Sequence, residues 1–226
     1  MSTNLVAIQS FGAFSCVKIR ILTNNTVIPI KENALKFQLI MENLEQFGIQ
    51  NDLAQSDKSK QYLNITKDTG EFLSVLVKAT GARRILEVGT SNGYSTIWLA
   101  SALPEDGKVY TIEANSQKIE EASINFHKTH TSSKIAQLVG DVAEVLSDVP
   151  ESMDFIFLDA DRKTYVSLAD NIFNLLKAGG LLVCDNAISH ADELTEFRAW
   201  ISSQKNLSVS LVPVGKGELL VYKSEK

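Results

Sequence analysis

The sequence predicts an α/β protein built on a doubly wound, mostly parallel sheet of seven strands with an antiparallel last strand. From about residue 83 onward, short apolar runs alternate with segments of helical period, as in successive βαβ units. These runs are nearly continuous, which is typical of strands covered on both faces. The last two runs are joined by only three residues, too few for a parallel crossover, so they are expected to pair antiparallel.

Five parallel strands are expected, each followed by a helix candidate. They span residues 84–88, 108–113, 134–139, 154–159 and 181–185. Two of the helix candidates have apolar residues at i, i+3 and i+7, which are Ile119, Ala122 and Phe126, and Leu194, Phe197 and Ile201. These helices should lie on the sheet. The closing hairpin joins residues 207–214 to residues 218–223 through Gly215-Lys216-Gly217.

Two amphipathic helices are expected before the sheet, as a cap over its C-terminal edge. Their apolar positions are Phe37, Ile40, Met41 and Leu44 in the first helix, and Phe72, Val75, Leu76 and Ala79 in the second. The polar stretch 50–61 joins them. Further upstream, residues 17–21 and 27–30 form a candidate hairpin. We therefore expect an N-terminal segment with a cap helix over residues 1–60 and a main domain over residues 61–226.

Composition limits the classes of protein. Of the 226 residues, 44% are apolar, which is enough for one substantial core. The formal charge of -5, from 27 acidic and 22 basic residues without a basic cluster, disfavours a nucleic-acid partner. No apolar run approaches the ~18 residues of a membrane span, and no basic residue precedes the apolar stretch 5–17 as in a signal peptide. A cytoplasmic protein is expected. Having only Cys16 and Cys184 argues against a disulfide framework or a cysteine-based zinc site.

A glycine turn follows the first predicted strand, within residues 85–95. Gly89 and Gly93 permit a positive φ and remove the Cβ that would block a ligand, while the N–H groups of a helix start favour an anionic group. A tight turn without a ligand explains the two glycines equally well. The G-x-x-x-G spacing differs from the dinucleotide fingerprint and, with the closing hairpin, argues against an NAD-dependent oxidoreductase.

Carboxylates follow the next two strands. Glu113 ends the second strand, where an acidic side chain can accept both hydroxyls of a ribose. Asp141 follows the third strand and could receive the amino group of an adenine, or it could cap the helix that begins near Val142. Together with the glycine turn, these positions favour an adenosine-containing ligand.

A second acidic group follows the fourth and fifth strands, at Asp159, Asp161, Asp185 and Asn186. Ligands in open α/β sheets bind at these carboxyl ends. Two carboxylates and an amide oxygen could hold Mg²⁺ or Ca²⁺ and leave positions for water and a chelating substrate. The alternative is structural, with Asp161 capping the next helix and Asp185-Asn186 turning the chain.

Four motifs, taken together and in order, resemble the cation-dependent small-molecule O-methyltransferases of the caffeoyl-CoA and catechol type. They are residues 87–96 (EVGTSNGYST), 157–161 (FLDAD), 176–180 (LKAGG) and Asp185-Asn186. The resemblance covers residues 61–224 and implies a Rossmann-like class I methyltransferase fold, S-adenosylmethionine as methyl donor, a divalent cation, a small-molecule acceptor and a homodimer. The donor-binding residues that it implies are Glu87, Gly89, Thr90, Ser95, Glu113, Asp141, Val142 and Asp159. The cation ligands that it implies are Asp159, Asp185 and Asn186.

The sequence departs from this family directly after the Asp-Ala-Asp motif. A lysine usually stands there in the family, whereas this chain has Arg162 followed by Lys163. An arginine cannot act as a base, because its pKa stays above ~12. Lys163 could substitute, and Arg162 could instead pair with Asp159 or Asp185 and replace the cation.

A second departure follows Asn186, where the tryptophan-bearing insertion of the caffeoyl-CoA enzymes is missing. Ser189 and Asp192 have the spacing of a capping box, which predicts that a helix starts at once. His190 is either a base that faces the site or a surface histidine at the helix start. The candidate catalytic residues are therefore Asp159, Arg162, Lys163 and His190.

Methyl transfer needs an acceptor oxygen that is oriented and at least partly deprotonated, and a divalent cation serves both needs. Two alternatives stay open at this point. One is a methyltransferase of the same fold that acts on a modified tRNA base, which would need a basic rim. The other is a non-catalytic protein that binds S-adenosylmethionine, and only Arg162 favours it.

Overall fold

The computed structural model describes residues 20–23, 26–29, 32–150 and 152–225. At the N-terminal end, β1 (Arg20–Thr23) and β2 (Thr26–Pro29) form a two-stranded antiparallel sheet. The predicted hairpin is thus confirmed, with its first strand placed later in the sequence than expected. The predicted strand residues 17–19 and Ile30, the apolar stretch 5–17 and Cys16 lie outside the described residues.

The main sheet has seven strands in the order β5-β4-β3-β6-β7-β9-β8. The parallel strands are β3 (Arg84–Val88), β4 (Lys108–Glu113), β5 (Ile135–Val139), β6 (Met153–Leu158) and β7 (Leu176–Cys184), followed by β8 (Leu207–Val212) and β9 (Glu218–Lys223). The last strand, β9, pairs antiparallel with β8, as the short Gly-Lys-Gly link predicts, and it also pairs antiparallel with β7. This order confirms the predicted fold class. Only β7 begins clearly earlier than expected, at Leu176 instead of residue 181. Its additional residues pair with the start of β6 across an irregularity in register between Met153 and Phe155.

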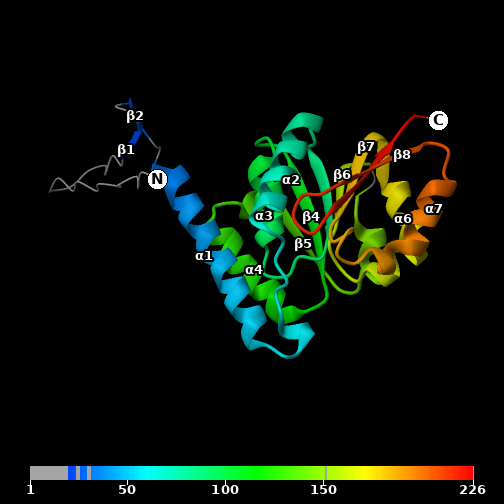
Figure 1. Ribbon diagram of the computed structural model, residues 1–226, viewed down its shortest axis with the longest axis horizontal. Coiled ribbons are helices and arrows are strands. Elements are labelled where there is room, and N and C mark those ends of the chain that lie inside the picture. The colour runs from blue at the N-terminus through cyan, green and yellow to red at the C-terminus, as the bar shows by residue number, and fades with distance from the viewer. Residues whose placement is uncertain (1–19, 24–25, 30–31, 151, 226) are drawn as a thin grey trace.

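Helices cover both faces of the sheet (Figure 1). On one face lie α2 (Lys67–Thr80), α3 (Tyr94–Ala102) and α4 (Ser116–Lys128), and on the other lie α5 (Val142–Val145), α6 (Tyr165–Leu175) and α7 (Thr195–Ser203). Alternate residues of β3 serve the two cores, because Ile85 packs with the first set of helices and Leu86 with the second. Short 3-10 helices lie at Lys58–Lys60, Ser132–Lys134, Leu146–Asp148, Arg162–Thr164 and Ala191–Leu194.

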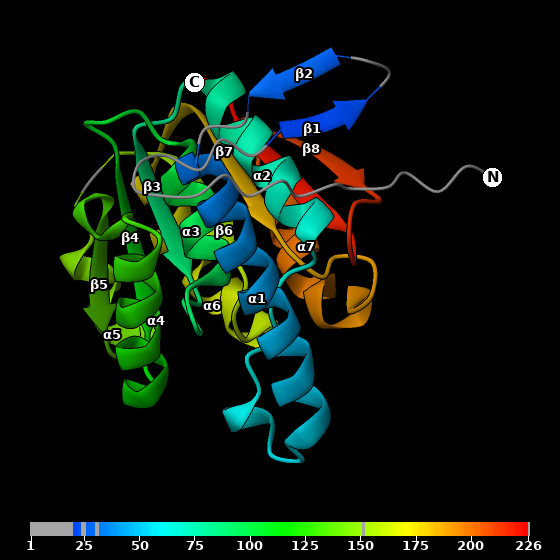
Figure 2. The ribbon, with the colours of Figure 1, turned by 90° about the vertical axis from the view of Figure 1, so that its left-hand side faces the viewer.

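The long helix α1 (Glu32–Ala54) forms a further layer outside α2 and α3 (Figure 2). Its residues Met41 and Leu44 are buried in the same core cluster as Leu73 of α2 and Ile97 of α3. The first two helices were expected to cap the C-terminal edge of the sheet. That prediction is wrong for α1, which packs on α2 and α3 instead. The contact with that edge comes from the segment after α1, where the Tyr62 carbonyl accepts a hydrogen bond from the Ser91 hydroxyl at 2.7 Å.

The buried face of α2 differs from the predicted one. Leu73 and Val77 are buried, whereas Val75 is 62% exposed. Leu73 and Val77 pack in the core cluster shared with α3, and α2 approaches α3 closely at Gly70, where a Cβ would lie 2.4 Å from Nε1 of Trp98. Among the described residues, no helix is long and apolar enough to cross a membrane.

Candidate active site at the C-terminal edge of the sheet

The two glycines of the turn between β3 and α3 both have structural reasons. Gly89 has φ +106°, and a Cβ there would lie 2.2 Å from the Asp159 carbonyl oxygen at the end of β6. Gly93 has φ +85°, and its Cβ would lie 2.4 Å from the ring of Phe126. Positive φ and close approach are what glycine permits. The turn is therefore packed tightly against β6 and α4, and this packing is compatible with a ligand on its open side.

Glu87 lies in β3, two residues before Gly89 of this turn, and its side chain is fully buried. Its Oε2 atom accepts hydrogen bonds from the hydroxyls of Thr96 and Thr111, and the Thr111 hydroxyl lies 2.6 Å from that of Thr90. Its Oε1 atom has no hydrogen-bond partner. Burial raises the pKa of Glu87 to about 7, although the neighbouring hydroxyls of Ser95, Thr111 and Thr96 oppose the rise. A buried carboxylate oxygen without a partner favours a cationic ligand beside it.

Glu113, at the end of β4, organises the turn directly. Its Oε2 accepts from the backbone N–H of Ser91 at 2.9 Å, and its Oε1 accepts from the N–H groups of Ala114 and Asn115 at 3.1 and 2.9 Å. Carboxylate oxygens have further lone pairs, so the predicted ribose contact stays a prediction.

Asp141 caps α5, as its structural interpretation predicted. Its Oδ1 accepts a hydrogen bond from the Ala143 N–H at 2.9 Å. Val142, the first residue of α5, follows Asp141 directly, close to the end of β5. The side chain is exposed at this edge of the sheet, and its predicted contact with an adenine is untested by these bonds.

Asp159, Asp185 and Asn186 are brought together at the ends of β6 and β7. The Asn186 Nδ2 lies 3.3 Å from Oδ1 of Asp159 and 2.7 Å from Oδ2 of Asp185. Asn186 has φ +64° and turns the chain, so the structural interpretation of Asp185-Asn186 also holds. A rotation of the Asn186 amide by half a turn would present its oxygen to a cation beside the two carboxylates.

The electrostatics of this group favour a cation. Burial raises the pKa of Asp159 well above its usual range, and the charges of Asp185 and Glu87 add to the rise, against the opposing charges of Lys216 and Arg162. In the part of the chain that the structure describes, no group of three or more His, Cys, Asp or Glu side chains is arranged to hold a metal ion. Two carboxylates and an amide nevertheless fit a hard divalent cation in donor type and charge.

Sequence reasoning missed Glu218, the first residue of β9. It is fully buried, and its Oε1 accepts from the Thr69 hydroxyl at 3.0 Å while its Oε2 has no partner. Burial, followed by the charge of Asp185, raises the pKa of Glu218 to about 10. The alternation of residues along β9 does not tell which face of the sheet the Glu218 side chain lies on. Its position beside the acidic group follows only from the register between β9 and β7.

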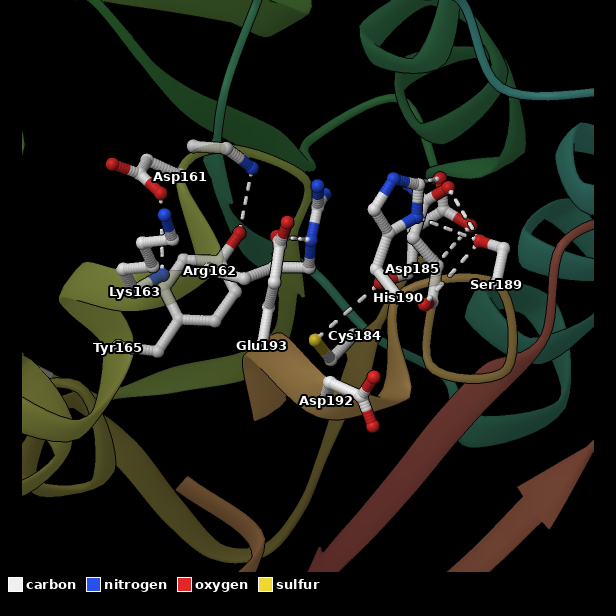
Figure 3. A network of polar contacts seen from close by, with 12 residues as sticks. Asp161, Arg162, Lys163, Tyr165, Cys184, Asp185, Ser189, His190, Asp192 and Glu193 are labelled. Carbon is white, nitrogen blue, oxygen red and sulfur yellow. Dashed lines mark hydrogen bonds and ion pairs between the residues drawn. The ribbon is translucent and has the colours of Figure 1, made fainter. Parts of the chain in front are cut away.

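The candidate basic residues lie in different surroundings (Figure 3). The Arg162 Nε pairs with Glu193 at 2.8 Å, so the predicted alternative of a bidentate pair with Asp159 or Asp185 is not what the structure shows. Lys163 is exposed beside Asp161, which caps the 3-10 helix Arg162–Thr164 as expected of its structural interpretation.

His190 lies next to the acidic group. Its Nδ1 is 2.9 Å from the Ser189 hydroxyl, which is 3.3 Å from the Asn186 Oδ1. The capping box predicted for Ser189 and Asp192 is wrong, because the Ser189 hydroxyl contacts His190 and Asn186 instead. A helix does start at once, as the 3-10 helix Ala191–Leu194, and it continues into α7 at Thr195.

The comparisons with known proteins agree with this site. The family model described as "O-methyltransferase" matches residues 32–224. The chain is 29% identical over 177 residues to a catechol O-methyltransferase of Niastella koreensis, covering 76% of this chain and 79% of the relative. It is 28% identical to caffeoyl-CoA O-methyltransferase 2 of Petunia hybrida, covering 69% and 74%. A solved structure of the O-methyltransferase from Bacillus cereus in complex with SAH superimposes with a TM-score of 0.70 at 25% identity, covering 82% of this chain and 91% of that one.

A doubly wound sheet with an antiparallel β9 and acidic strand ends thus defines an enzyme of the class I methyltransferase type. The chain belongs to the O-methyltransferase family.

Proposed function

We propose that this protein transfers a methyl group from S-adenosylmethionine to a hydroxyl of a small catechol-like or other phenolic acceptor, with a divalent cation held by Asp159, Asp185 and Asn186. The observation that supports this most is the group of buried acidic side chains where β3, β6 and β7 end. The Glu87 Oε1 has no partner, and Asp159 has a strongly raised pKa beside Asp185. A sulfonium donor and a divalent cation are the two cationic ligands that this family chemistry requires.

When bound, the donor supplies the methyl group as an electrophile, and the cation favours the deprotonated form of a coordinated hydroxyl. The residues of the chain bind and orient these groups. Glu113 would accept the ribose hydroxyls while it holds the Ser91 N–H, and Glu87 would face the positive charge of the donor from below the turn. Asp141 and Val142 would line the adenine side of the site.

His190 is the residue we propose as proton acceptor. Its imidazole contacts Ser189, which also contacts Asn186, so it lies beside the proposed cation ligands. An imidazole there can take a proton from an acceptor hydroxyl near neutral pH. Lys163 is less suited, because it is exposed beside Asp161. Arg162 would contribute positive potential near Asp159 while its Nε pairs with Glu193.

Three further properties belong to the proposal. We propose a homodimer and a cytoplasmic location, as the family resemblance implies. We also propose the division into an N-terminal segment with a cap helix over residues 1–60 and a methyltransferase domain over residues 61–226. Sedimentation of the full chain tests the first, and limited proteolysis between residues 55 and 62 tests the last.

The function is tested by methyl transfer from labelled S-adenosylmethionine to a panel of catechols and to caffeoyl-CoA, with and without EDTA and added Mg²⁺. We expect transfer that is lost with EDTA and regained with Mg²⁺. Asp185→Asn should abolish turnover while the affinity for S-adenosylhomocysteine stays within about threefold, since the cation serves the acceptor. Full activity after exhaustive EDTA treatment, with no gain on adding Mg²⁺, would refute the cation. Transfer to none of these acceptors would refute the acceptor class.

A further inference from the structure

The start of β9 brings a third acidic side chain to the proposed cation centre. β9 runs antiparallel to β7 in a register that pairs Cys184 with Leu219, so the next position places Asp185 opposite Glu218. The main chains stay in contact beyond this point, because the Ala187 N–H donates to the Gly217 carbonyl at 2.8 Å. Directly opposite side chains on antiparallel strands have Cβ atoms about 4.5–5.5 Å apart, and like charges there are destabilising. The backbone therefore holds these two acidic residues together.

Glu218 is also held in place from a third element. The Thr69 hydroxyl, in the first turn of α2, donates to its Oε1 at 3.0 Å, and Asp68 of the same turn accepts from the Gly215 N–H at 3.2 Å. The other carboxyl oxygen is buried without an N–H or hydroxyl donor, and it faces the carboxyl groups of Asp185 and Asp159, whose interaction with Glu218 adds to the rise in its pKa. A buried acceptor that lacks a partner is costly. A divalent cation beside these three carboxyl groups would offset their mutual repulsion.

We propose that Glu218 is a third acidic residue of the cation centre, a positioning residue that contacts Asp185 and increases the affinity of the centre for a divalent cation. This inference rests on the proposed cation. Because the described carboxylates are not arranged as a group of three metal ligands, Glu218 is assigned to act through Asp185. Residues that contact metal ligands commonly change metal affinity by about 10–100-fold when they are substituted. The neighbouring Lys216 is exposed, and its charge opposes the rise in the pKa of Asp159.

The test is titration of the full chain with Mn²⁺, followed by electron paramagnetic resonance of the free ion, without methyl donor or acceptor. Glu218→Gln should weaken Mn²⁺ binding at least tenfold, since an amide cannot release a proton to balance the bound cation, although it keeps the shape and the contact with Thr69. Glu218→Asp, which keeps a carboxyl group, should bind Mn²⁺ more tightly than Glu218→Gln. The control is Glu105→Gln, which removes one negative charge from an exposed side chain in the loop between α3 and β4 and should bind like the parent.

A purely structural role of Glu218 predicts the opposite order, because the shorter Asp leaves a cavity whereas Gln fills the same volume. Equal Mn²⁺ affinity of the parent and Glu218→Gln would overturn the inference while leaving the cation in place. If the parent itself binds no Mn²⁺, the proposed cation and this inference both fail. If Glu218→Gln does not fold, Thr69→Val, which removes the hydroxyl that holds the Glu218 carboxyl in place, is used instead, and an affinity equal to the parent's would again overturn the inference.

Discussion

Replacing Glu87 by glutamine should make the protein more stable at alkaline pH. Burial raises the pKa of Glu87 from an ordinary 4.5 to about 7, so the folded protein binds this proton more tightly than the unfolded chain. The stability from this proton is therefore present below pH 4.5 and is lost as the pH rises through 7. Glutamine resembles the protonated form at every pH, and it keeps an acceptor for Thr96 or Thr111.

The size of the effect follows from the two pKa values. Each pKa unit corresponds to about 1.4 kcal/mol, so the difference in unfolding free energy between Glu87→Gln and the parent should change by about 2–3 kcal/mol between pH 5 and pH 8.5. For a chain of this length that is a shift of about 5–10 °C in Tm. Urea unfolding of both proteins at half-unit pH intervals measures it, with Glu105→Gln as a control for the loss of one charge. A difference that stays constant across this range would refute the reasoning that Glu87 is buried without a cationic partner.

Three further predictions concern the turn and its neighbours. Glu113→Gln should weaken S-adenosylhomocysteine binding about tenfold with little change in Tm, whereas Glu113→Ala should lower both the affinity and Tm, because it also releases the Ser91 N–H. Calorimetry measures the affinity and thermal melting measures Tm, and unchanged affinity in both variants would contradict the ribose contact. Gly89→Ala should lower the free energy of unfolding by about 1–3 kcal/mol or more, because Gly89 has a positive φ and a Cβ there would meet the Asp159 carbonyl oxygen. Urea unfolding measures this loss, and an unchanged free energy of unfolding would show that the turn relaxes easily. Arg162→Met should remove the pair with Glu193 at a cost of about 1 kcal/mol or less and leave transfer dependent on Mg²⁺, and loss of the response to Mg²⁺ would show that Arg162 serves the cation site.

Local patterns were enough to predict most of the sheet. The strands β3, β4 and β9 begin and end where the apolar runs predict, since a strand buried on both faces leaves a continuous apolar run. The antiparallel pairing of β9 followed from the three-residue link. The buried face of α2 was predicted wrongly, because its apolar residues allow more than one inward face and the packing against α3 buries the face with Leu73 and Val77.

The positions of Glu87, Glu113, Asp159 and Asp185 at the sheet edge were determined by the sequence itself, because parallel strands end at one edge and each of these residues lies in or directly after such a strand. What each side chain contacts was decided only by the tertiary structure. Arg162 pairs with Glu193 from a segment 31 residues away, which no local pattern indicates.

Glu218 shows the same limit most clearly. Its acidic side chain looks like any other at the start of a strand, and only the register between β9 and β7 brings it opposite Asp185 and removes it from water. Burial and charge between residues distant in sequence depend on how strands pair, and a shift of one residue in that pairing would have turned Glu218 to the other face of the sheet.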